Sequence, residues 1–189
     1  MKRRVGLLTG TFDPVHLGHI AMARAAMADC ALAEVWFLVN PDPGHKAGVT
    51  PAADRQAMVA LAVAGEAGLR AGEPDARSGL QAHRMADFDL LTGKYPDTDF
   101  VYIIGADVLA SMSTWEDYEL AVQRARFAVA HRAGAPKVVL AAGLRAQMFE
   151  LTQHGGASSR VIQRQLAAGE VPAELDPRVY EYIRARGLY

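Results

Sequence analysis

The sequence predicts an α/β protein in which helices cover both faces of a parallel sheet. Short apolar runs, of the kind found in buried strands, alternate along the chain with segments whose apolar residues recur at helical spacing. A turn that contains glycine directly follows the first apolar run. Because parallel strands are joined by crossover helices, this alternation favours a doubly wound parallel sheet. Ligands bind such sheets beyond the carboxyl ends of the strands.

The individual elements follow from local patterns. Residues 5–8 form an apolar run that stops at a Thr-Gly-Thr turn, and residues 17–28 have helical spacing. Residues 34–39 predict a second strand, which the turn-forming residues 40–44 close. Residues 65–84 have weak periodicity and predict no element. The later predicted elements are a helix over 54–67, strands at 100–104 and 127–130 separated by helical patterns around Leu109 and over 118–124, a helical pattern that follows Ser158-Ser159 and ends at Gly169, and a helix over 177–186.

The composition fits one packed domain and excludes several classes of protein. The chain has 189 residues, 51% of them hydrophobic, and 20 Lys and Arg against 21 Asp and Glu, a net charge of −1. This balance offers no broad basic surface for nucleic acid. The single cysteine, Cys30, excludes a disulfide framework and a Cys-rich metal site, and favours a cytoplasmic location. No apolar stretch approaches the ~20 residues of a membrane span.

Three loops are expected at the ligand-binding edge of the sheet, at 9–19, 40–46 and 105–115. The first is the most informative, because residues 10–19 read GTFDPVHLGH. A glycine turn brings backbone N–H groups near a ligand, and the following helix directs its N-terminal donors and dipole to the same place. The loop therefore predicts an anion site, without the GK[ST] ending of a Walker loop or the third spaced glycine of a dinucleotide fingerprint.

Two histidines, His16 and His19, stand three residues apart at the start of the predicted helix. This spacing places both side chains on one face, towards whatever the loop holds. Paired histidines also serve as caps or half-buried packing residues. They can form part of a metal site, but no nearby Cys, Glu or further His supplies a third ligand in the sequence. Their position after a glycine turn at a strand end favours phosphate-binding imidazoles.

The same residues carry a resemblance to a known family. His16-Leu17-Gly18-His19 is the HxGH signature of the nucleotidyltransferase superfamily, and the wider motif at 10–19 resembles the bacterial nicotinate-nucleotide adenylyltransferases. Further segments are similar to that family: 35–46, with Gly44 in place of the second proline of a PPHK loop, the "R…M" helix at 54–58, the IIGAD segment at 103–107 followed by Trp115, the strand-end Arg132, and the V-x-x-YI…GLY pattern at 177–189.

The resemblance implies a Rossmann-like α/β fold and a reaction that joins ATP to nicotinate mononucleotide with release of pyrophosphate. It implies one nucleotidyltransferase domain over 1–189, with a C-terminal helical part at about 156–189. Mg²⁺ would be held mostly by ATP oxygens and waters, as suits a small octahedral ion, rather than by the protein. The implied catalytic residues are His16, His19 and Lys46; the implied ATP-binding residues are these three with Gly10, Thr11, Phe12, Gly18, His45, Gly105, Asp107, Arg132, Ser158 and Ser159; the implied acceptor-binding residues are Trp115 and Asn40. Arg160 is expected as a further ATP-binding residue and Arg84 as a further acceptor-binding residue, both in segments that depart from the family pattern.

Several of these residues also have a structural interpretation. His45-Lys46 could be an exposed polar tip of a loop. Asp107, two residues after a strand-end glycine, could cap the next helix. Trp115 could be a core residue, whereas the family's tryptophan at this position stacks on a pyridine ring.

Two segments depart from the family pattern. At 158–163 the chain reads SSRVIQ where the family has SSTxIR, so Gln163 stands at the position of a phosphate-binding arginine. Arg160 or Arg164 is then the substitute; Arg160 lies in the first turn and is preferred, because Arg164 is displaced about 100° around the helix from that position. The serine pair is in any case an expected helix N-cap. Residues 82–87, AHRMAD, replace the family's SYTxDT segment, so that His83 and Arg84 either contact an anionic acceptor or lie on the surface.

The sequence thus predicts an adenylyltransferase that uses ATP and a mononucleotide acceptor, first of all nicotinate mononucleotide. A different phosphorylated acceptor, such as nicotinamide mononucleotide or phosphopantetheine, stays open, and so does a nucleotide-binding paralogue without transfer activity. No nucleic acid or membrane is expected as a partner. The oligomeric state, including a homo-oligomer, is left open.

Overall fold

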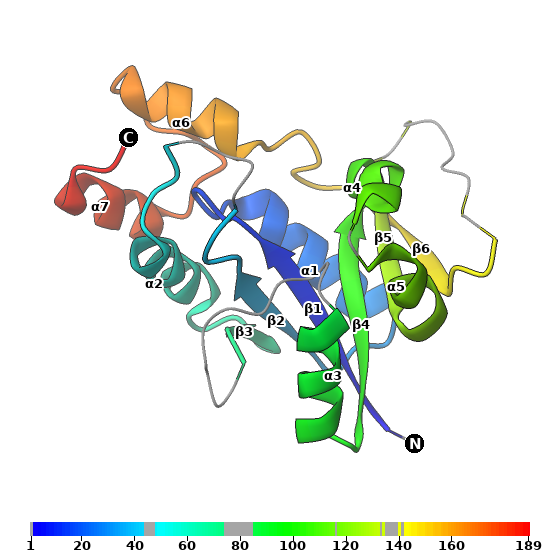
Figure 1. Ribbon diagram of the computed structural model, residues 1–189. Coiled ribbons are helices and arrows are strands. Elements are labelled where there is room, and N and C mark those ends of the chain that lie inside the picture. Colours follow the sequence, from blue (N-terminus) through cyan, green and yellow to red (C-terminus); the bar gives the residue numbers. More distant parts are fainter. Residues whose placement is uncertain are drawn as a thin grey trace.

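The chain folds around one six-stranded sheet in which every pairing is parallel. The computed structural model describes residues 2–43, 48–73, 85–115, 117–132, 134, 140 and 142–189. The strands are β1 (Arg3–Gly10), β2 (Glu34–Val39), β3 (Leu69–Ala71), β4 (Thr98–Gly105), β5 (Arg126–Arg132) and β6 (Ala146–Leu151). Their spatial order is β3-β2-β1-β4-β5-β6 (Figure 1). The order reverses between β1 and β4, which is the point where such sheets bind ligands.

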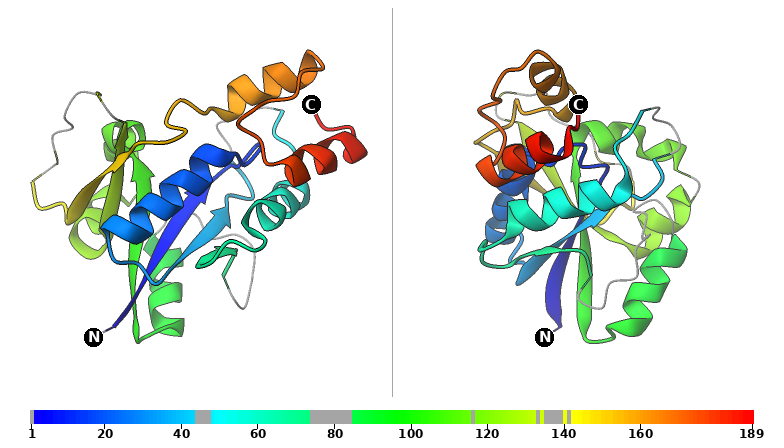
Figure 2. Two further views of the ribbon diagram at one scale, coloured as in Figure 1. Left: turned by 180° about the vertical axis from the view of Figure 1, so that it is seen from behind. Right: turned by 90° about the vertical axis from the view of Figure 1, so that its left-hand side faces the viewer.

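Helices cover both faces of the sheet (Figure 2). One face, called the α1/α2 face below, carries α1 (Leu17–Asp29), α2 (Ala52–Val63), α6 (Ser159–Ala167) and α7 (Pro177–Arg186). The other, called the α3/α5 face, carries α3 (Met85–Lys94), α4 (Ala106–Ser111), the 3₁₀ turn η1 (Met112–Thr114) and α5 (Tyr118–Arg124). The predicted doubly wound fold is therefore confirmed. Among the helices that the structure describes, none is both long and apolar enough to cross a bilayer.

The strand pleat divides the apolar side chains between two cores. In β4, Val101 and Ile103 pack on the α1/α2 face, whereas Phe100 and Tyr102 pack on the α3/α5 face. This alternation follows from the two-residue period of a strand. Gly6 allows close packing within the first core, because a Cβ there would lie 2.7 Å from Cδ1 of Ile103.

Most predicted elements are confirmed, and the predicted helices over 118–124 and 177–186 coincide with α5 and α7. The helix predicted over 54–67 is shorter, since α2 ends at Val63. Ala64 is extended, with ψ 122°, and Gly65 has a left-handed φ of 80°, so the helix cannot continue.

Three elements were not predicted. The strands β3 and β6 lie at the two edges of the sheet and bury few side chains, so neither has a continuous apolar run. In α3 the buried residues Met85, Phe88 and Leu91 recur at a spacing of three, which is a helical signal that could have been used. The rest of the region without periodicity, residues 74–84, lies outside the described residues.

Candidate functional site

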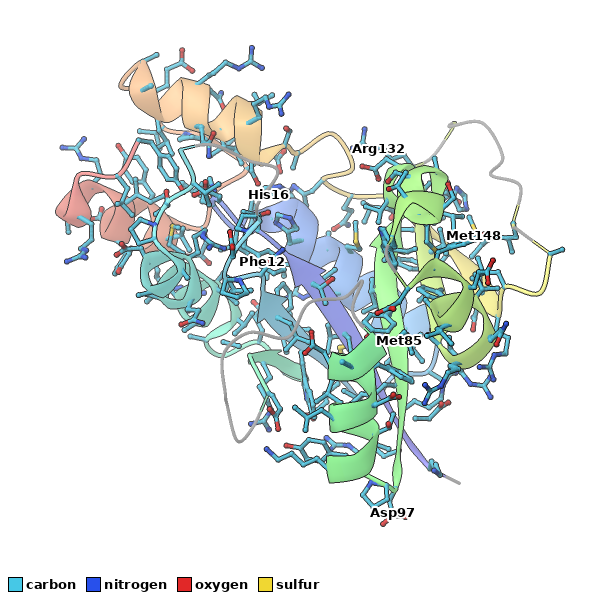
Figure 3. All side chains as sticks on the ribbon, viewed as in Figure 1. Phe12, His16, Met85, Asp97, Arg132 and Met148 are labelled. Carbon is cyan, nitrogen blue, oxygen red and sulfur yellow. The ribbon has the colours of Figure 1, made fainter. Side chains whose placement is uncertain are left out.

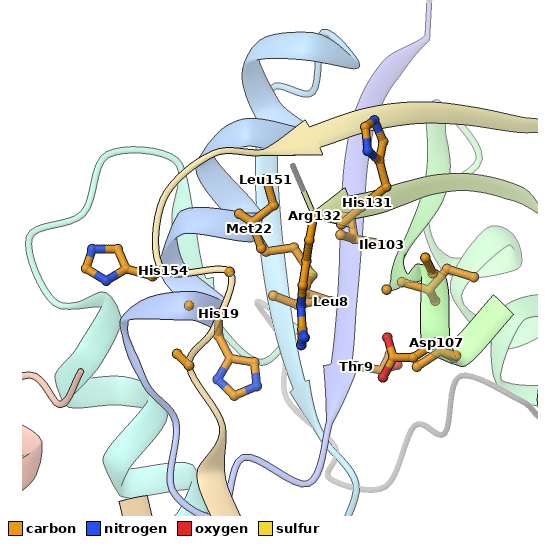
Figure 4. Close-up of a pocket in the computed structure, with 18 of the residues that line it drawn as sticks. Leu8, Thr9, His19, Met22, Ile103, Asp107, His131, Arg132, Leu151 and His154 are labelled. Atoms are coloured by element: carbon orange, nitrogen blue, oxygen red, sulfur yellow. The ribbon is translucent and has the colours of Figure 1, made fainter. Parts of the chain in front are cut away.

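A cleft with a volume of about 520 Å³ lies at the carboxyl ends of β1, β4 and β5, where the strand order reverses (Figure 4). The start of α1, the start of α4 and the loop after β6 complete its wall. Of the residues predicted to bind substrate, seven line this cleft: His16, Gly18, His19, Gly105, Asp107, Trp115 and Arg132.

The loop after β1 turns in a way that the sequence did not predict. Gly10 still belongs to the sheet, where it pairs with Val39, and the left-handed backbone conformation falls on Phe12, with φ 50°. A Cβ at Gly10 would lie only 3.2 Å from the Phe12 ring. Gly10 is therefore needed for the space that the ring occupies, and the expectation that it supplies the turn is wrong. The following Asp13-Pro14 peptide bond is cis.

Phe12 was predicted to bind ATP, but its side chain belongs to the core. The residue is 2% exposed, and its ring packs at 5.7 Å from the ring of Phe37 and at 5.0 Å from that of His19, centroid to centroid. Figure 3 shows Phe12 and His16 close together at the start of α1. The Phe12 ring therefore packs against His19 and forms part of the core.

His16 and His19 lie side by side, as their spacing predicts. His16 occupies the N-cap position of α1 with extended backbone angles, and its backbone N–H donates to Nδ1 of His19 at 3.2 Å. The two ring centroids are 3.8 Å apart. Both rings line the cleft, at the positive end of the helix dipole, where anions are favoured.

His16 is the more buried of the two histidines, with 7% of its surface exposed. Burial, with a smaller contribution from nearby His154, lowers the pKa of His16 to about 4. Its imidazole is therefore neutral at pH 7. Among the described residues its Nδ1 atom is buried without a hydrogen-bond partner.

Gly18, between the two histidines, is required by close packing. A Cβ at this position would lie 2.9 Å from the His154 carbonyl oxygen, 3.0 Å from Cβ of Ala157 and 3.0 Å from Nδ1 of His16. Only glycine therefore lets the loop after β6 pack against the start of α1 without displacing the His16 ring.

The opposite wall of the cleft carries Arg132 and Asp107. Figure 4 shows the Arg132 side chain extending from the end of β5 into the space between His19 and Asp107. Asp107 is exposed in the first turn of α4, and a Cβ at Gly105 would collide with its carboxylate. The N-cap of α4 is Gly105, and the helix has no side-chain cap hydrogen bond, so Asp107 is not the cap considered above.

Trp115 combines both interpretations given for it. The residue is partly buried and packs against the core of the α3/α5 face, and it also lines the cleft. One part of the indole is thus fixed by the core while the cleft receives another part.

The other predicted binding residues do not line the cleft or cannot be placed. His45, Lys46 and Arg84 lie outside the described residues. Within the described chain, Gly10, Thr11, Phe12, Asn40, Ser158, Ser159 and Arg160 are not part of the cleft wall. The Asn40 side chain instead closes a turn, since its Oδ1 accepts the Asp42 N–H at 3.1 Å.

The two serines at the start of α6 have different roles, and Ser159 binds the loop after β1. Ser158 occupies the N-cap position, as predicted, although its side chain makes no cap hydrogen bond. Ser159 Oγ donates to the Pro14 carbonyl at 2.9 Å. Gln163, at the position aligned with the motif arginine, likewise donates to the Asp13 carbonyl at 2.7 Å. Arg160 is exposed in the first turn of α6.

Two further histidines, His131 and His154, line the cleft and were not predicted. Nδ1 of His154 lies 2.5 Å from the Glu174 carboxylate, and Figure 4 shows the His154 ring turned away from the cavity. His154 has a left-handed φ of 53° directly before Gly155-Gly156. In the sequence, His154 stands directly before Gly155-Gly156 and close to the serine pair, and this pattern could have indicated that His154 lies near the site.

The polar side chains of the cleft suit a metal ion that is bound mainly by substrate phosphates. In the described part of the chain, no group of three His, Cys, Asp or Glu side chains could hold a metal ion. Asp107 is the carboxylate among the described lining residues, and the other polar side chains there are hydroxyl, imidazole and guanidinium groups. Mg²⁺ commonly keeps several waters and takes one or two carboxylates together with substrate phosphates, so these residues fit such an ion.

Comparison with known proteins places the chain in a family. A cytidylyltransferase-like family model matches residues 7–165. A protein of Gloeobacter violaceus named probable nicotinate-nucleotide adenylyltransferase is 36% identical over 205 residues, which cover 100% of this chain and 97% of that protein. A protein of the same name from Neisseria gonorrhoeae is 32% identical over 198 residues, with 99% and 98% covered.

The fold has a close match among solved structures. The Plasmodium falciparum nicotinic acid mononucleotide adenylyltransferase complexed with NaAD matches with a TM-score of 0.80 and 15% identity, over 99% of this chain and 97% of that chain. At this identity the match concerns the fold alone, whereas the sequence relatives cover the whole chain at a higher identity. The chain therefore belongs to the cytidylyltransferase-like family and, within it, to the nicotinate-nucleotide adenylyltransferases.

Proposed function

We propose that the cleft transfers the AMP moiety of ATP to nicotinate mononucleotide, as a step of NAD biosynthesis. An oxygen of the mononucleotide phosphate attacks the α-phosphorus of ATP, the bond from that phosphorus to the bridging oxygen breaks, and pyrophosphate leaves. The observation that carries the proposal is the convergence of His16, His19, Arg132, Asp107 and Trp115 on one cleft at the switch point of the sheet, in a chain of this family.

Such a transfer needs no nucleophile from the protein. Charge develops on the bridging and non-bridging oxygens, so catalysis comes from positioning the two phosphates and stabilising that charge. The proposal assigns this role to His16 and His19 on one side of the triphosphate and to Arg132 on the other. The predicted contacts of Gly10, Thr11, Gly18, Ser158, Ser159 and Arg160 with phosphate, and the closure by His45 and Lys46, belong to the same proposal.

The protonation state of His16 in the free protein suits a hydrogen-bond donor to phosphate. With a pKa of about 4, the ring is neutral in the free protein and donates a single N–H. A triphosphate beside it adds negative charge, which favours the protonated ring and a stronger hydrogen bond.

The acceptor is assigned to the side of the cleft that Trp115 lines. A flat, electron-poor pyridine ring suits the face of an indole, and Asn40 and Arg84 are the other predicted acceptor contacts. Gly105 and Asp107 would lie against the adenosine part of ATP. Mg²⁺ would be held by the phosphates with Asp107 near its waters, and when bound it would neutralise phosphate charge. A cytoplasmic location, predicted from the single cysteine, completes the proposal.

An acceptor panel tests this function. The purified chain is incubated with ATP, Mg²⁺ and, separately, nicotinate mononucleotide, nicotinamide mononucleotide and phosphopantetheine, and pyrophosphate release and product mass are measured. Deamido-NAD formed fastest with the nicotinate compound is the expected result. A faster reaction with another acceptor would reassign the substrate, and ATP binding without turnover on any acceptor would indicate a nucleotide-binding paralogue instead.

A further inference from the structure

A buried guanidinium lies beneath the two loops that follow β1 and β2. Arg55, in α2, is 1% exposed. Its Nη1 donates to the carbonyl oxygens of Thr11 at 2.8 Å and Asn40 at 2.7 Å, its Nη2 to that of Pro41 at 3.1 Å, and its Nε to that of Thr50 at 2.7 Å. All four acceptors are backbone carbonyls, so these hydrogen bonds depend on the position of the backbone and not on the side chains of the four residues.

These carbonyls belong to segments that are far apart in sequence. Thr11 follows β1, Asn40 and Pro41 follow β2, and Thr50 leads into α2. The Asn40 N–H also donates to the Gly10 carbonyl at 2.8 Å, which extends the pairing of β1 with β2 by one step. Because a guanidinium is planar and its donors have fixed directions, Arg55 sets the two loops in one relative position.

The loop after β1 is held from its other side by Tyr189. The hydroxyl of this residue donates to Oδ1 of Asp13, while Oδ2 of Asp13 accepts the Thr50 N–H at 3.3 Å. Asp13 is 7% exposed. Burial and this hydrogen bond raise the pKa of Tyr189, so the phenol stays protonated and donates at every pH at which the fold is used. The Asp13 carbonyl accepts the Gln163 amide as well.

Groups from α2, α6 and the end of the chain therefore bind hydrogen-bond acceptors of residues 11–14. This segment lies just before His16, the N-cap residue of α1. Neither Arg55 nor Tyr189 lines the cleft. Burial lowers the pKa of Arg55, which means that its burial weakens the charged state of the guanidinium. The nearby Asp13 carboxylate offsets part of this cost, and the directed hydrogen bonds of the guanidinium to carbonyls specify geometry well.

We propose that Arg55 and Tyr189 are positioning residues for adenylyl transfer: acting through Thr11 and Asp13, they fix the loop that delivers His16 and His19 to the phosphates. This inference rests on the proposed function. In a transfer without a covalent intermediate, alignment of the phosphates supplies most of the rate, and a displacement of about 1 Å costs on the order of 100-fold. The two residues thus act on the rate of the chemical step and not on the affinity for ATP.

The test compares matched substitutions. Arg55→Lys keeps the charge and loses the planar fork, and Tyr189→Phe removes one hydroxyl. Their controls are Arg186→Lys and Tyr182→Phe, the same changes at residues that bind the Asp54 carboxylate, at 3.1 and 2.8 Å, rather than Thr11, Asp13, Asn40 or Pro41 of the two loops. We expect kcat to fall about 100-fold in Arg55→Lys and about 10-fold in Tyr189→Phe, with KM values nearly unchanged, and to stay within about 2-fold in the controls.

A second measurement does not depend on activity. Amide hydrogen exchange over 11–16, followed by mass spectrometry, is expected to speed up in Arg55→Lys and Tyr189→Phe and to match the wild type in both controls. Wild-type kcat in Arg55→Lys and Tyr189→Phe, or an equal loss in test and control variants, would overturn the inference. If Arg55→Lys does not fold, the pair Tyr189→Phe and Tyr182→Phe decides.

The two proposals fail separately. A wild-type chain that forms no dinucleotide with any acceptor refutes the proposed function, and the exchange data still decide whether the two residues hold the loop. A wild-type chain that is active, with Tyr189→Phe and Arg55→Lys equally active, refutes only the positioning role.

Discussion

The two faces of the sheet each have an apolar core, and they differ in the contacts that accompany it. On the α1/α2 face, buried polar groups join α2 to its surroundings: Arg55 binds four carbonyls of the loops, and Asp54 binds Tyr182 and Arg186 of α7. On the α3/α5 face, aromatic rings pack on one another in a chain that runs from Tyr95 through Trp36 and Phe100 and in a second group of Phe88, Tyr102 and Phe127.

The difference separates positioning from stability. Hydrogen bonds are directional and fail when the partner moves by less than 1 Å, so they fix where a loop lies. Contacts between apolar surfaces have no direction and grow with the area buried, so they stabilise the sheet without specifying the cleft. Substitutions on the α1/α2 face next to the cleft are therefore expected to change kinetics, and those in the aromatic core to change the free energy of unfolding.

The largest effect is expected for His19→Ala. Loss of a donor to the developing charge costs about 10²–10³ in turnover, and the variant should keep its fold, because the ring is only partly buried. Measured kcat, with circular dichroism as the check on folding, decides this. Turnover close to that of the wild type would remove His19 from the proposed mechanism.

The aromatic core is tested by Phe100→Ala. Phe100 is 2% exposed and packs against Trp36, with ring centroids 5.4 Å apart, so its loss should reduce the free energy of unfolding by about 3–5 kcal/mol. The kcat of the folded variant should match the wild type. Leu90→Ala, at a residue that is 65% exposed on the same face, is the control and should change stability by less than about 0.5 kcal/mol. A large loss of kcat in folded Phe100→Ala would contradict the separation of the two faces.

A smaller effect should appear in the pH dependence of stability. The pKa of His16 is about 4 in the folded chain, against 6.5 for an unperturbed histidine, so between these values the unfolded chain binds more protons and stability falls as the pH is lowered. From pH 7 to pH 5 this histidine should cost the free protein about 2 kcal/mol. Urea unfolding of the wild type and of His16→Gln at both pH values measures the difference. An equal pH dependence in both would show that His16 is not held neutral.

The smallest effect is expected on the surface of the α3/α5 face. Arg124 in α5 binds both carboxylate oxygens of Asp89 in α3, at 2.5 and 3.1 Å, and both side chains are nearly half exposed. An exposed pair of this kind contributes about 0–1 kcal/mol. A double-mutant cycle with Arg124→Ala and Asp89→Ala, followed by thermal unfolding at low and high salt, measures the coupling. A coupling well above this range, insensitive to salt, would mean that polar contacts hold this face too.

The sequence allowed a prediction wherever the signal is local. The spacing of His16 and His19 placed both rings on one face of a helix start, and the alternation of strands and helices placed Asp107, Trp115 and Arg132 at the same edge of the sheet. A motif does not show whether a side chain points to the ligand or into the core, and the ring of Phe12 lies in the core. The edge strand β6 was not predicted, because only some of its side chains are buried and it has no continuous apolar run.

The sequence by itself determined the fold class, the family, and the loop with its two histidines, because apolar periodicity and a ten-residue motif are properties of short stretches of chain. Only the tertiary structure decided that Arg55 binds the carbonyls of both loops, that Tyr189 reaches Asp13, and that Gly18 leaves room for His154. These contacts join residues up to 176 positions apart. Many of their acceptors are backbone carbonyls, which every residue has, so the letters of the sequence do not mark them.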